Sequence, residues 1–394
     1  MRVDEWNVHP AHVWIHGQRP EKIVDYDESL KMWNVYGYPE AVEILTQPTV
    51  FSNNCGRLDP IDLPEDICAG DFSQMDPPEH RKVRGLVEFA FSPKLVAGLE
   101  QRVEALVHEL LDELAGREGF DLVTDLSTPL PMTVICELLG VPREDRARIH
   151  RWSQEMAGSD DFEPPEVAQE DTYALQRAFD LLREMREYWT GLARERRRRP
   201  GEDLLSHLVH VEVEGERLGE TEVFNIANRL MINGHHSTSM LLSNTMLILD
   251  AFPDQAARVR ADRSLLTPMI EESLRFFSPV TTVGKATNTD VVLAGTHIPK
   301  DQLVMVWTGA ANRDERAFDS PHTFDPARTP NPHLGFGRGV HFCVGRRLGR
   351  MTVRTAVNAL LDRFPTLRTD PASPPSFIQI ADAGGMESMP VLVS

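Results

Sequence analysis

Cys343 stands in a stretch whose residue types could do metal or nucleophile chemistry. Gly337, Gly339 and Gly345 surround it, and glycine permits a left-handed backbone or the close approach of a flat group. The run from Arg346 to Leu361 predicts a helix, whose first N–H groups and dipole favour negative charge. A cysteine beside such a helix N-terminus is stabilised as a thiolate, the form that ligates metals and attacks electrophiles. We therefore expect Cys343 to be a metal ligand or a nucleophile.

The neighbours of Cys343 favour the metal-ligand interpretation. Phe336 and Phe342 give an apolar wall, and Arg338 and His341 could reach anionic groups at the edge of a ligand. The glycines would let a planar macrocycle lie against the backbone. This combination is typical of haem b held by a thiolate. The alternative is a buried, inert cysteine beside a glycine loop.

The stretch from Phe336 to Gly345 has Phe-Gly-x-Gly-x-His-x-Cys-x-Gly at every fixed position, and here the chain resembles the cytochrome P450 family of haem-thiolate monooxygenases. The resemblance extends from Tyr36 to Val391. It implies the mainly α-helical P450 fold with a minor β region. It also implies that Cys343 ligates the iron of haem b, iron protoporphyrin IX, with Phe336, Gly337 and Gly345 against the cofactor.

Composition narrows the class of protein. The chain has 394 residues and no linker, repeat or low-complexity tract, so we expect a single P450 domain over residues 1–394. Four cysteines without a leader segment before them indicate a reducing cytoplasm. No apolar run approaches the roughly 18 residues of a membrane span, so we expect no membrane anchor, as in bacterial-type members of the family. A net charge of −19 argues against nucleic acid as a partner.

The stretch from Asp76 to Glu79 predicts the start of a helix, because an aspartate that can cap is followed by two prolines and a glutamate. His80 and Arg84 are four residues apart in that helix and share one face. The resemblance implies that both hold a haem propionate. The alternative is a solvated, charged helix face.

Two further residues are expected at the haem propionates. Lys285 stands where relatives commonly have an arginine, and His341 belongs to the cysteine motif. Lysine keeps the positive charge of arginine but loses its planar fork. The resemblance therefore gives Lys285 and His341 propionate contacts.

The segment from residue 224 to 249 predicts a helix that is buried nearly all round, except at residues 233–238. Polar groups in the middle of a buried helix need partners or a cavity. The resemblance identifies this segment as the helix that crosses the haem, where the family has Ala-Gly-x-(Asp/Glu)-Thr. This chain keeps the glycine but has other residues around it: Asn233, Gly234, His236, Ser237 and Thr238.

In the family, the alcohol and the acid of this motif deliver protons to dioxygen. Ser237 keeps a hydroxyl, and a histidine such as His236, with a reference pKa of about 6.5, relays protons near neutral pH. We expect an altered but working relay through these two residues, with Asn233 contacting substrate or water and with Gly234 and Thr238 in the same catalytic segment. The alternative is that His236 makes a structural hydrogen bond and water alone delivers protons.

The arginines of the C-terminal half predict two roles: some form a structural ion-pair cluster, and others form a docking surface for a partner protein. Glu272 and Arg275 are three apart in a predicted helix and can pair, and the resemblance implies a buried triad with Arg328. From Phe336 to Arg354 there is no acidic residue but five arginines, at positions 338, 346, 347, 350 and 354. Such a local reversal of charge predicts docking of an acidic electron carrier, a ferredoxin or, less favoured, a flavodoxin, with its reductase. The alternative is that these arginines fold back on the acidic surface.

Other stretches predict the remaining elements. Helices are expected at residues 39–46, 103–116 and 175–192, from their apolar spacing. Strands are expected between residues 291 and 306, and a last hairpin turn at residues 381–386. Residues 51–75 are rich in Asp, Pro and Asn and predict a long loop.

By the resemblance, the protein is a monooxygenase that activates dioxygen with electrons from its carrier. We expect it to hydroxylate a small apolar organic molecule of secondary metabolism, in a pocket that includes Val280, Val283, Ile380 and Ala381. One alternative is a peroxide-driven member, or a non-hydroxylating one that performs desaturation or coupling. Another is a non-enzymatic haem sensor with His235 or His236 as a sixth ligand.

Overall fold

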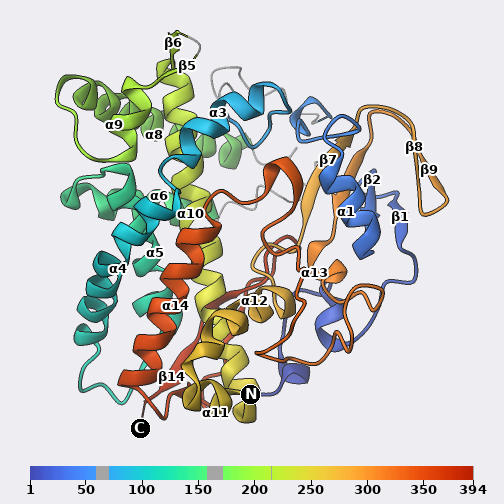
Figure 1. Ribbon diagram of the computed structural model, residues 1–394, viewed down its shortest axis with the longest axis vertical. Coiled ribbons are helices and arrows are strands. Elements are labelled where there is room, and N and C mark those ends of the chain that lie inside the picture. The colour runs from blue at the N-terminus through green and yellow to red at the C-terminus, as the bar shows by residue number, and fades with distance from the viewer. Residues whose placement is uncertain (59–70, 158–171, 214, 394) are drawn as a thin grey trace. The chain divides into compact units, whose positions relative to one another are not determined.

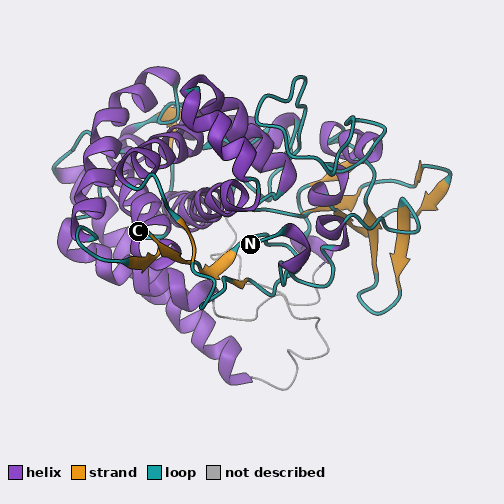
Figure 2. Cartoon of the chain, turned by 90° about the horizontal axis from the view of Figure 1, so that it is seen from below, coloured by secondary structure: helices purple, strands orange, loops and turns teal. Residues whose placement is uncertain are grey.

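The computed structural model describes residues 1–58, 71–157, 172–213 and 215–393 (Figure 1). Helices make up most of this part of the chain, and the strands are short (Figure 2). The predicted mainly α fold with a minor β region is therefore confirmed. Within the described residues, no helix is both long and apolar enough to cross a membrane. Cys68 and the middle of the predicted loop at 51–75 lie outside the described residues.

The chain forms two compact units. The first contains Met1–Cys55, Phe91–Pro131 and His236–Ser394, and the second contains Gly56–Ala90 and Met132–His235. The chain passes from one unit to the other within the long helix that carries residues 233–238. The expectation of a single domain over the whole chain stays a prediction.

Within the described residues, the α-helices are α1 (Tyr38–Thr46), α3 (Glu79–Glu88), α4 (Pro93–Glu113), α5 (Pro129–Leu139), α6 (Arg146–Ala157), α8 (Thr172–Arg198), α9 (Leu204–His210), α10 (Glu220–Ala251), α11 (Pro253–Ala261), α12 (Leu266–Phe276), α13 (Thr308–Ala311) and α14 (Arg346–Arg363). Seven of these helices were predicted, namely α1, α3, α4, α8, α10, α12 and α14, and α4 starts ten residues before its predicted start. The structure adds α5, α6, α9, α11 and α13, which were not predicted.

Helix α3 begins at Glu79, later than the predicted aspartate cap. Pro78 is its N-cap residue, and the backbone carbonyl of Asp76 accepts the N–H of His80 at 3.0 Å. A residue before proline is disfavoured in the helical region, so the Pro77-Pro78 pair delays the helix. The prediction placed the helix correctly but not its first residue.

The main sheet belongs to the first unit. Its strands are β1 (Val24–Asp27), β2 (Met32–Val35), β3 (Phe51–Ser52), β7 (Val283–Thr287) and β10 (Leu303–Val306), in the order β1-β2-β10-β7-β3. Strand β10 runs parallel to β2 and antiparallel to β7, with Val304 opposite Lys285. Val35, Ile44 and Val306 are fully buried where the sheet packs with α1. The sheet thereby fixes Lys285 inside the unit.

The other strands pair locally. They are β4 (Gly119–Asp121), β11 (Arg368–Thr369) and β14 (Pro390–Leu392) in one small sheet, and the pairs β5 (Glu212–Val213) with β6 (Glu216–Arg217), β8 (Val291–Leu293) with β9 (Thr296–Ile298), and β12 (Ser376–Phe377) with β13 (Met386–Ser388). The β12–β13 pair confirms the predicted last hairpin. Phe51 and Ser52, expected in a loop, instead pair with β7.

Helix α14 is packed on both α4 and α12 in the first unit, and Figure 1 shows α14 alongside α4. Val353, Ala356, Val357 and Leu360 of α14 are fully buried. The predicted apolar stripe of α4 is also buried at Val103, Leu106 and Leu114. Helix α14 is therefore held firmly at the end of the Cys343 loop.

Candidate active site

The Cys343 loop runs directly into helix α14. Gly337 and Gly339 have φ angles of +69° and +75°, which favour glycine. A Cβ on Gly339 would also lie 2.2 Å from the carbonyl oxygen of Leu45. Gly345 is the N-cap residue of α14, so the half-buried Cys343 lies just before the helix, where the dipole favours a thiolate.

Aromatic rings and arginines brace this loop on both sides. The N–H of Cys343 donates to the carbonyl oxygen of Phe336 at 2.9 Å. Arg346 donates to the carbonyl oxygen of Cys343 at 2.8 Å and lies over the Phe342 ring at 4.7 Å from its centre. Arg350 lies over the Phe336 ring at 4.4 Å. The backbone before and after the cysteine is thus fixed.

The residues of this loop fit a haem. A Cβ on Gly337 would meet no atom within 4 Å, so a flat group could approach the backbone there. A Cβ on Gly345 would lie 4.0 Å from Cys343 Sγ, so the sulfur lies near the Gly345 backbone without being crowded by it. One thiolate with an open glycine backbone beside it suits a planar metal macrocycle.

Helix α10 has one face that points to the last hairpin. Ser237, Met240 and Asn244 share this face, because they are three or four residues apart. The Asn244 amide donates to the carbonyl oxygen of Gly384 at 2.8 Å, and a Cβ on Gly385 would lie 2.5 Å from Met240 Cγ. Ser237 therefore lies on the side of α10 that faces the expected substrate turn.

The other motif residues of α10 differ from one another in the helix face they occupy and in their exposure. Asn233 is four residues before Ser237, so it shares the Ser237 face, and its side chain is exposed. Thr238 Oγ1 lies 3.6 Å from the place of a Cβ on Gly349, so this hydroxyl faces α14. His236 is half-buried. Of the two predicted alcohols, Ser237 is the one on the α10 face toward the last hairpin, and its catalytic role stays a prediction.

His235 and Gly234 make close contacts within the second unit. A Cβ on Gly234 would lie 3.0 Å from the Ile135 side chain, so glycine lets α10 pack closely. The buried His235 has Nδ1 2.7 Å from the carbonyl oxygen of Met231 and Nε2 2.5 Å from the hydroxyl of Ser153. Because a carbonyl only accepts, Nδ1–H donates and Nε2 accepts from the serine. Both nitrogens are engaged, which argues against His235 as a sixth ligand.

The predicted propionate residues are divided between the units. In the second unit, His80 is buried on α3, and Arg84 on the same face donates from Nε to Glu88 at 2.8 Å. In the first unit, Lys285 is 2% exposed on β7 and donates to the side-chain oxygen of Asn53. His341 is half-buried in the short turn Gly339–His341. A buried ammonium favours an anionic neighbour, as a propionate would be.

The last hairpin turn is anchored by the N-terminal segment. The carbonyl oxygen of Ala381 accepts hydrogen bonds from His12 Nε2 at 2.8 Å and from the Thr281 hydroxyl at 2.7 Å. His12 is 1% exposed; burial lowers its pKa to about 4, despite the hydrogen bond to Ala381. Nothing in the sequence around His12 had singled it out, because its partner is 369 residues away.

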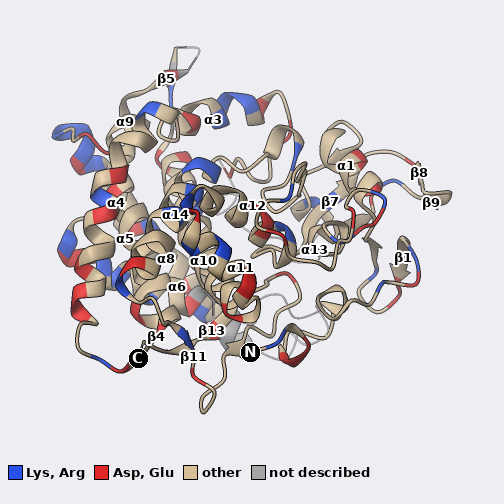
Figure 3. Cartoon of the chain, turned by 60° about the horizontal axis from the view of Figure 1, so that its bottom comes forward, with Lys and Arg blue, Asp and Glu red and all other residues tan. Residues whose placement is uncertain are grey.

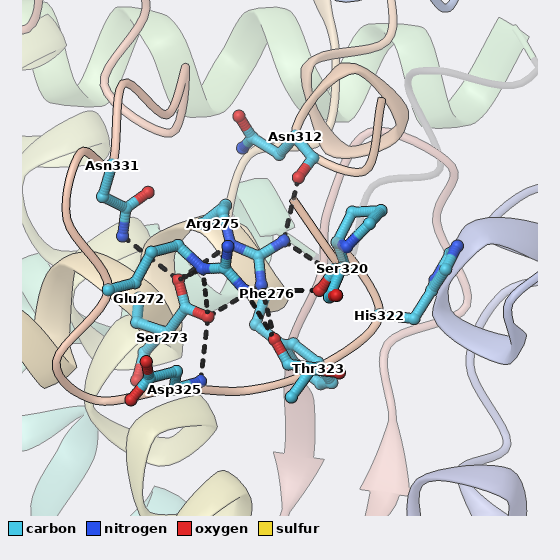
Figure 4. Close-up of polar contacts among 12 residues, drawn as sticks. Glu272, Ser273, Arg275, Phe276, Asn312, Ser320, His322, Thr323, Asp325 and Asn331 are labelled. Atoms are coloured by element: carbon cyan, nitrogen blue, oxygen red, sulfur yellow. Dashed lines mark hydrogen bonds and ion pairs between the residues drawn. The ribbon is translucent and has the colours of Figure 1, made fainter. Parts of the chain in front are cut away.

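The predicted triad of Glu272, Arg275 and Arg328 is present at α12, and Figure 4 shows Glu272 and Arg275. Arg275 donates to both oxygens of Glu272 at 2.8 Å, and Arg328 donates to the same carboxylate at 3.0 and 3.1 Å. Asn331 and the N–H of Asp325 donate to it as well. The carboxylate ties α12 to the chain that leads to the Cys343 loop.

Comparison with known proteins decides the family. The cytochrome P450 family model matches residues 26–388. The chain belongs to the cytochrome P450 family. It is therefore an oxidoreductase of the monooxygenase type that binds haem, and the predicted family, enzyme class and cofactor are confirmed.

Relatives of this P450 come from bacterial secondary metabolism. The cyclomarin C epoxidase CymV of Salinispora arenicola is 39% identical over 90% of this chain and 88% of its own. A solved structure of unusual cytochrome P450-like monooxygenases involved in microbial secondary metabolism is 56% identical, with a TM-score of 0.95 over 98% and 100% of the two chains. The hydroxylase HmtN, involved in himastatin biosynthesis, is 47% identical, with a TM-score of 0.89 over 100% of both chains.

Proposed function

We propose that this P450 hydroxylates a small apolar organic molecule of secondary metabolism, using dioxygen and electrons from a ferredoxin. The observation that carries the proposal is the position of Cys343, in a glycine loop at the N-terminus of α14. Haem, when bound, supplies dioxygen activation and transfer of one oxygen atom. We assign Cys343 as its thiolate ligand, Phe336, Gly337 and Gly345 as its contacts, and His80, Arg84, Lys285 and His341 as its propionate partners.

Proton delivery is assigned to α10. Inserting one oxygen atom of dioxygen into a C–H bond and reducing the other to water consumes two protons and two electrons. Ser237 lies on the helix face toward the last hairpin, and His236 is adjacent and half-buried. We assign these two residues to the relay and Asn233 to a substrate or water contact. Gly234 and Thr238 support the same segment by packing.

The expected lining residues and the relatives support the proposed substrate class. Val280 and Ile380 are large apolar side chains that are 41% and 37% exposed, and Val280 is bridged to Ala383 of the last turn. Apolar groups around a few polar ones are typical of sites for apolar organic ligands. CymV is named as an epoxidase and HmtN as a hydroxylase, which supports oxidation of a secondary metabolite.

The electron donor is assigned from the charge of α14 and its loop (Figure 3). Arg350 is paired with Glu271 and Arg354 with Glu100, so these two arginines fold back as the alternative expected. Arg338 and Arg347 are exposed. We therefore assign the docking of an acidic ferredoxin to Arg338 and Arg347. A flavodoxin is the less favoured donor. We place both proteins in the cytoplasm, as the cysteine usage predicts.

An absorption spectrum tests the proposal. When the wild type is reduced with dithionite under carbon monoxide, its Soret band should shift strongly to the red, as thiolate ligation of the haem iron requires. Cys343→Ser should lose this red-shifted band. Cys55→Ser, which changes another half-buried thiol, should keep it. A wild-type band at the histidine-type position would refute Cys343 as ligand. A red-shifted band with no product from any oxidisable apolar compound, given dioxygen, ferredoxin and reductase, would refute the monooxygenase assignment instead.

A further inference from the structure

A second carboxylate of α12, next to the triad glutamate, joins three elements of the first unit. Glu271 Oε1 accepts from Arg350 Nε at 2.6 Å, and Oε2 accepts from Arg350 Nη2 at 2.6 Å and from His333 Nε2 at 3.0 Å. Arg350 is on α14, and His333 begins the segment that leads to Cys343. Glu271 therefore links α12, the start of α14 and the approach to the cysteine.

The tautomer of His333 is fixed by its backbone. Its Nδ1 accepts the N–H of Gly335 at 3.1 Å, so the proton is on Nε2, which donates to Glu271. His333 therefore gives Glu271 a hydrogen bond, and the charge of Glu271 is balanced by Arg350. Burial raises the pKa of Glu271, but the hydrogen bonds from His333 and Arg350 and the positive charge of Arg350 outweigh it and lower the pKa to about 2. The carboxylate is ionised at any working pH.

The same cluster reaches the ligand loop by two routes. Arg350 lies over the Phe336 ring at 4.4 Å, and the carbonyl oxygen of Phe336 accepts the N–H of Cys343. A Cβ on Gly335 would lie 3.0 Å from the carbonyl oxygen of Leu274 and 3.3 Å from His333 Nδ1. The backbone before Phe336 is therefore wedged between α12 and the histidine.

We propose that Glu271, His333 and Arg350 are positioning residues that hold the Cys343 loop in the geometry that keeps the sulfur a thiolate ligand and sets the reduction potential. The reason is that groups around a ligating sulfur tune both properties. The inference rests on the proposed role of Cys343 as the haem ligand. It also explains why Arg350, within an arginine-rich stretch, is not part of the docking surface.

Charge and position can be separated with a double variant. Glu271→Gln alone removes a negative charge and Arg350→Gln alone removes a positive one, so simple electrostatics shifts the potential in opposite directions. Glu271→Gln/Arg350→Gln leaves the net charge unchanged, and any remaining effect reports on position. The matched control is Glu100→Gln/Arg354→Gln, which removes another arginine–carboxylate pair of α14. Arg350→Lys is a milder variant that keeps the charge and loses the fork.

The readouts are the reduced-carbonyl spectrum and the potential of the purified holoprotein. In the Glu271/Arg350 double variant, the absorbance of the red-shifted carbon monoxide band relative to the unshifted band should fall at least threefold. At a fixed solution potential, the ratio of ferrous to ferric protein should change at least threefold. Arg350→Lys should fall between it and the wild type, and the control should match the wild type. If the double variant and Arg350→Lys both had the spectrum and the potential of the wild type, the positioning inference would be overturned and the assignment of Cys343 would stand. A wild type without the red-shifted band would overturn the assignment of Cys343 and this inference with it.

Discussion

Glu272 and Arg275 face each other on α12 with both side chains at 0% exposure, joined by two hydrogen bonds of 2.8 Å (Figure 4). Arg275 also donates to the carbonyl oxygens of Asn312, Pro321 and Thr323. A buried ion pair with its remaining groups satisfied in this way is an anchor for the surrounding loops. Replacing one of the two charged residues by a neutral one leaves the other as an unpaired buried charge.

Glu272→Gln should therefore destabilise the protein by about 3–5 kcal/mol, because Arg275 and Arg328 lose their shared carboxylate. Urea unfolding followed by circular dichroism measures the loss. Glu212→Gln is the control, since it breaks an exposed pair with Arg217 and should cost less than about 1 kcal/mol. Equal losses in the two variants would show that the buried triad adds no stability.

The Glu272–Arg275 pair was predictable from its spacing, whereas Arg328, 56 residues from Glu272, was assigned to the triad only through the family resemblance. Glu272 and Arg275 are one helical turn apart, and the cysteine motif is contiguous, so local patterns reveal both. Helix α10 was predictable from a local pattern too, because apolar residues fill nearly all of its length outside residues 233–238. These features depend on neighbours in the chain.

The contacts that sequence reasoning missed join distant segments. Glu271 adjoins the triad glutamate, yet its partners His333 and Arg350 are 62 and 79 residues away. The anchoring of Ala381 by His12 and the pairing of Lys285 with Asn53 are likewise long-range. A periodic pattern in the sequence does not reveal such pairs. For Glu271, the one available signal was a carboxylate on the buried side of a helix, which needs a polar partner. The orientation of Thr238 toward α14 also required the structure.

His236→Ala should lower the product formed per NADPH consumed by about tenfold, a modest value for loss of a general acid. Ser237→Ala should do the same if the two act in one relay. Ser243→Ala is the control, because its hydroxyl bonds back to the carbonyl oxygen of Ser239 within α10. Coupling is measured as product against cofactor oxidation. Unchanged coupling in His236→Ala would favour delivery by water alone.

Lys285→Met should speed the loss of haem to a scavenging protein by roughly tenfold or more, since a charge-assisted hydrogen bond contributes about 1.5–3 kcal/mol. Lys285→Arg keeps the charge and should lose haem more slowly than Lys285→Met. Lys300→Met removes an exposed lysine and should behave as the wild type. Haem transfer is followed by the Soret band. Equal rates in Lys285→Met and the wild type would rule out the propionate contact.

Stability should fall as the pH falls from 6.5 to about 4, through His12. The pKa of His12 is lowered from 6.5 to about 4 in the fold by burial, so the unfolded chain binds the proton first in this window. Each pH unit there costs up to about 1.4 kcal/mol. In His12→Gln this part of the slope should vanish, while the neighbouring His9 and Asp382 titrate in both proteins. Urea unfolding at several pH values measures it, with the exposed His297→Gln as control. A slope that is the same in His12→Gln and the wild type would contradict the prediction.

Arg347→Glu should weaken the productive docking of an acidic ferredoxin, because it reverses an exposed charge at the start of α14. The apparent KM for ferredoxin should rise about tenfold at low salt, and the difference from wild type should shrink as salt screens the attraction. Lys22→Glu is the matched control, since it reverses another exposed cation of the first unit. The reduced-carbonyl spectrum should stay that of the wild type in both variants, which separates docking from an effect on the ligand. If Arg347→Glu and Lys22→Glu raised the KM equally, the net charge of the protein rather than the α14 surface would steer the donor.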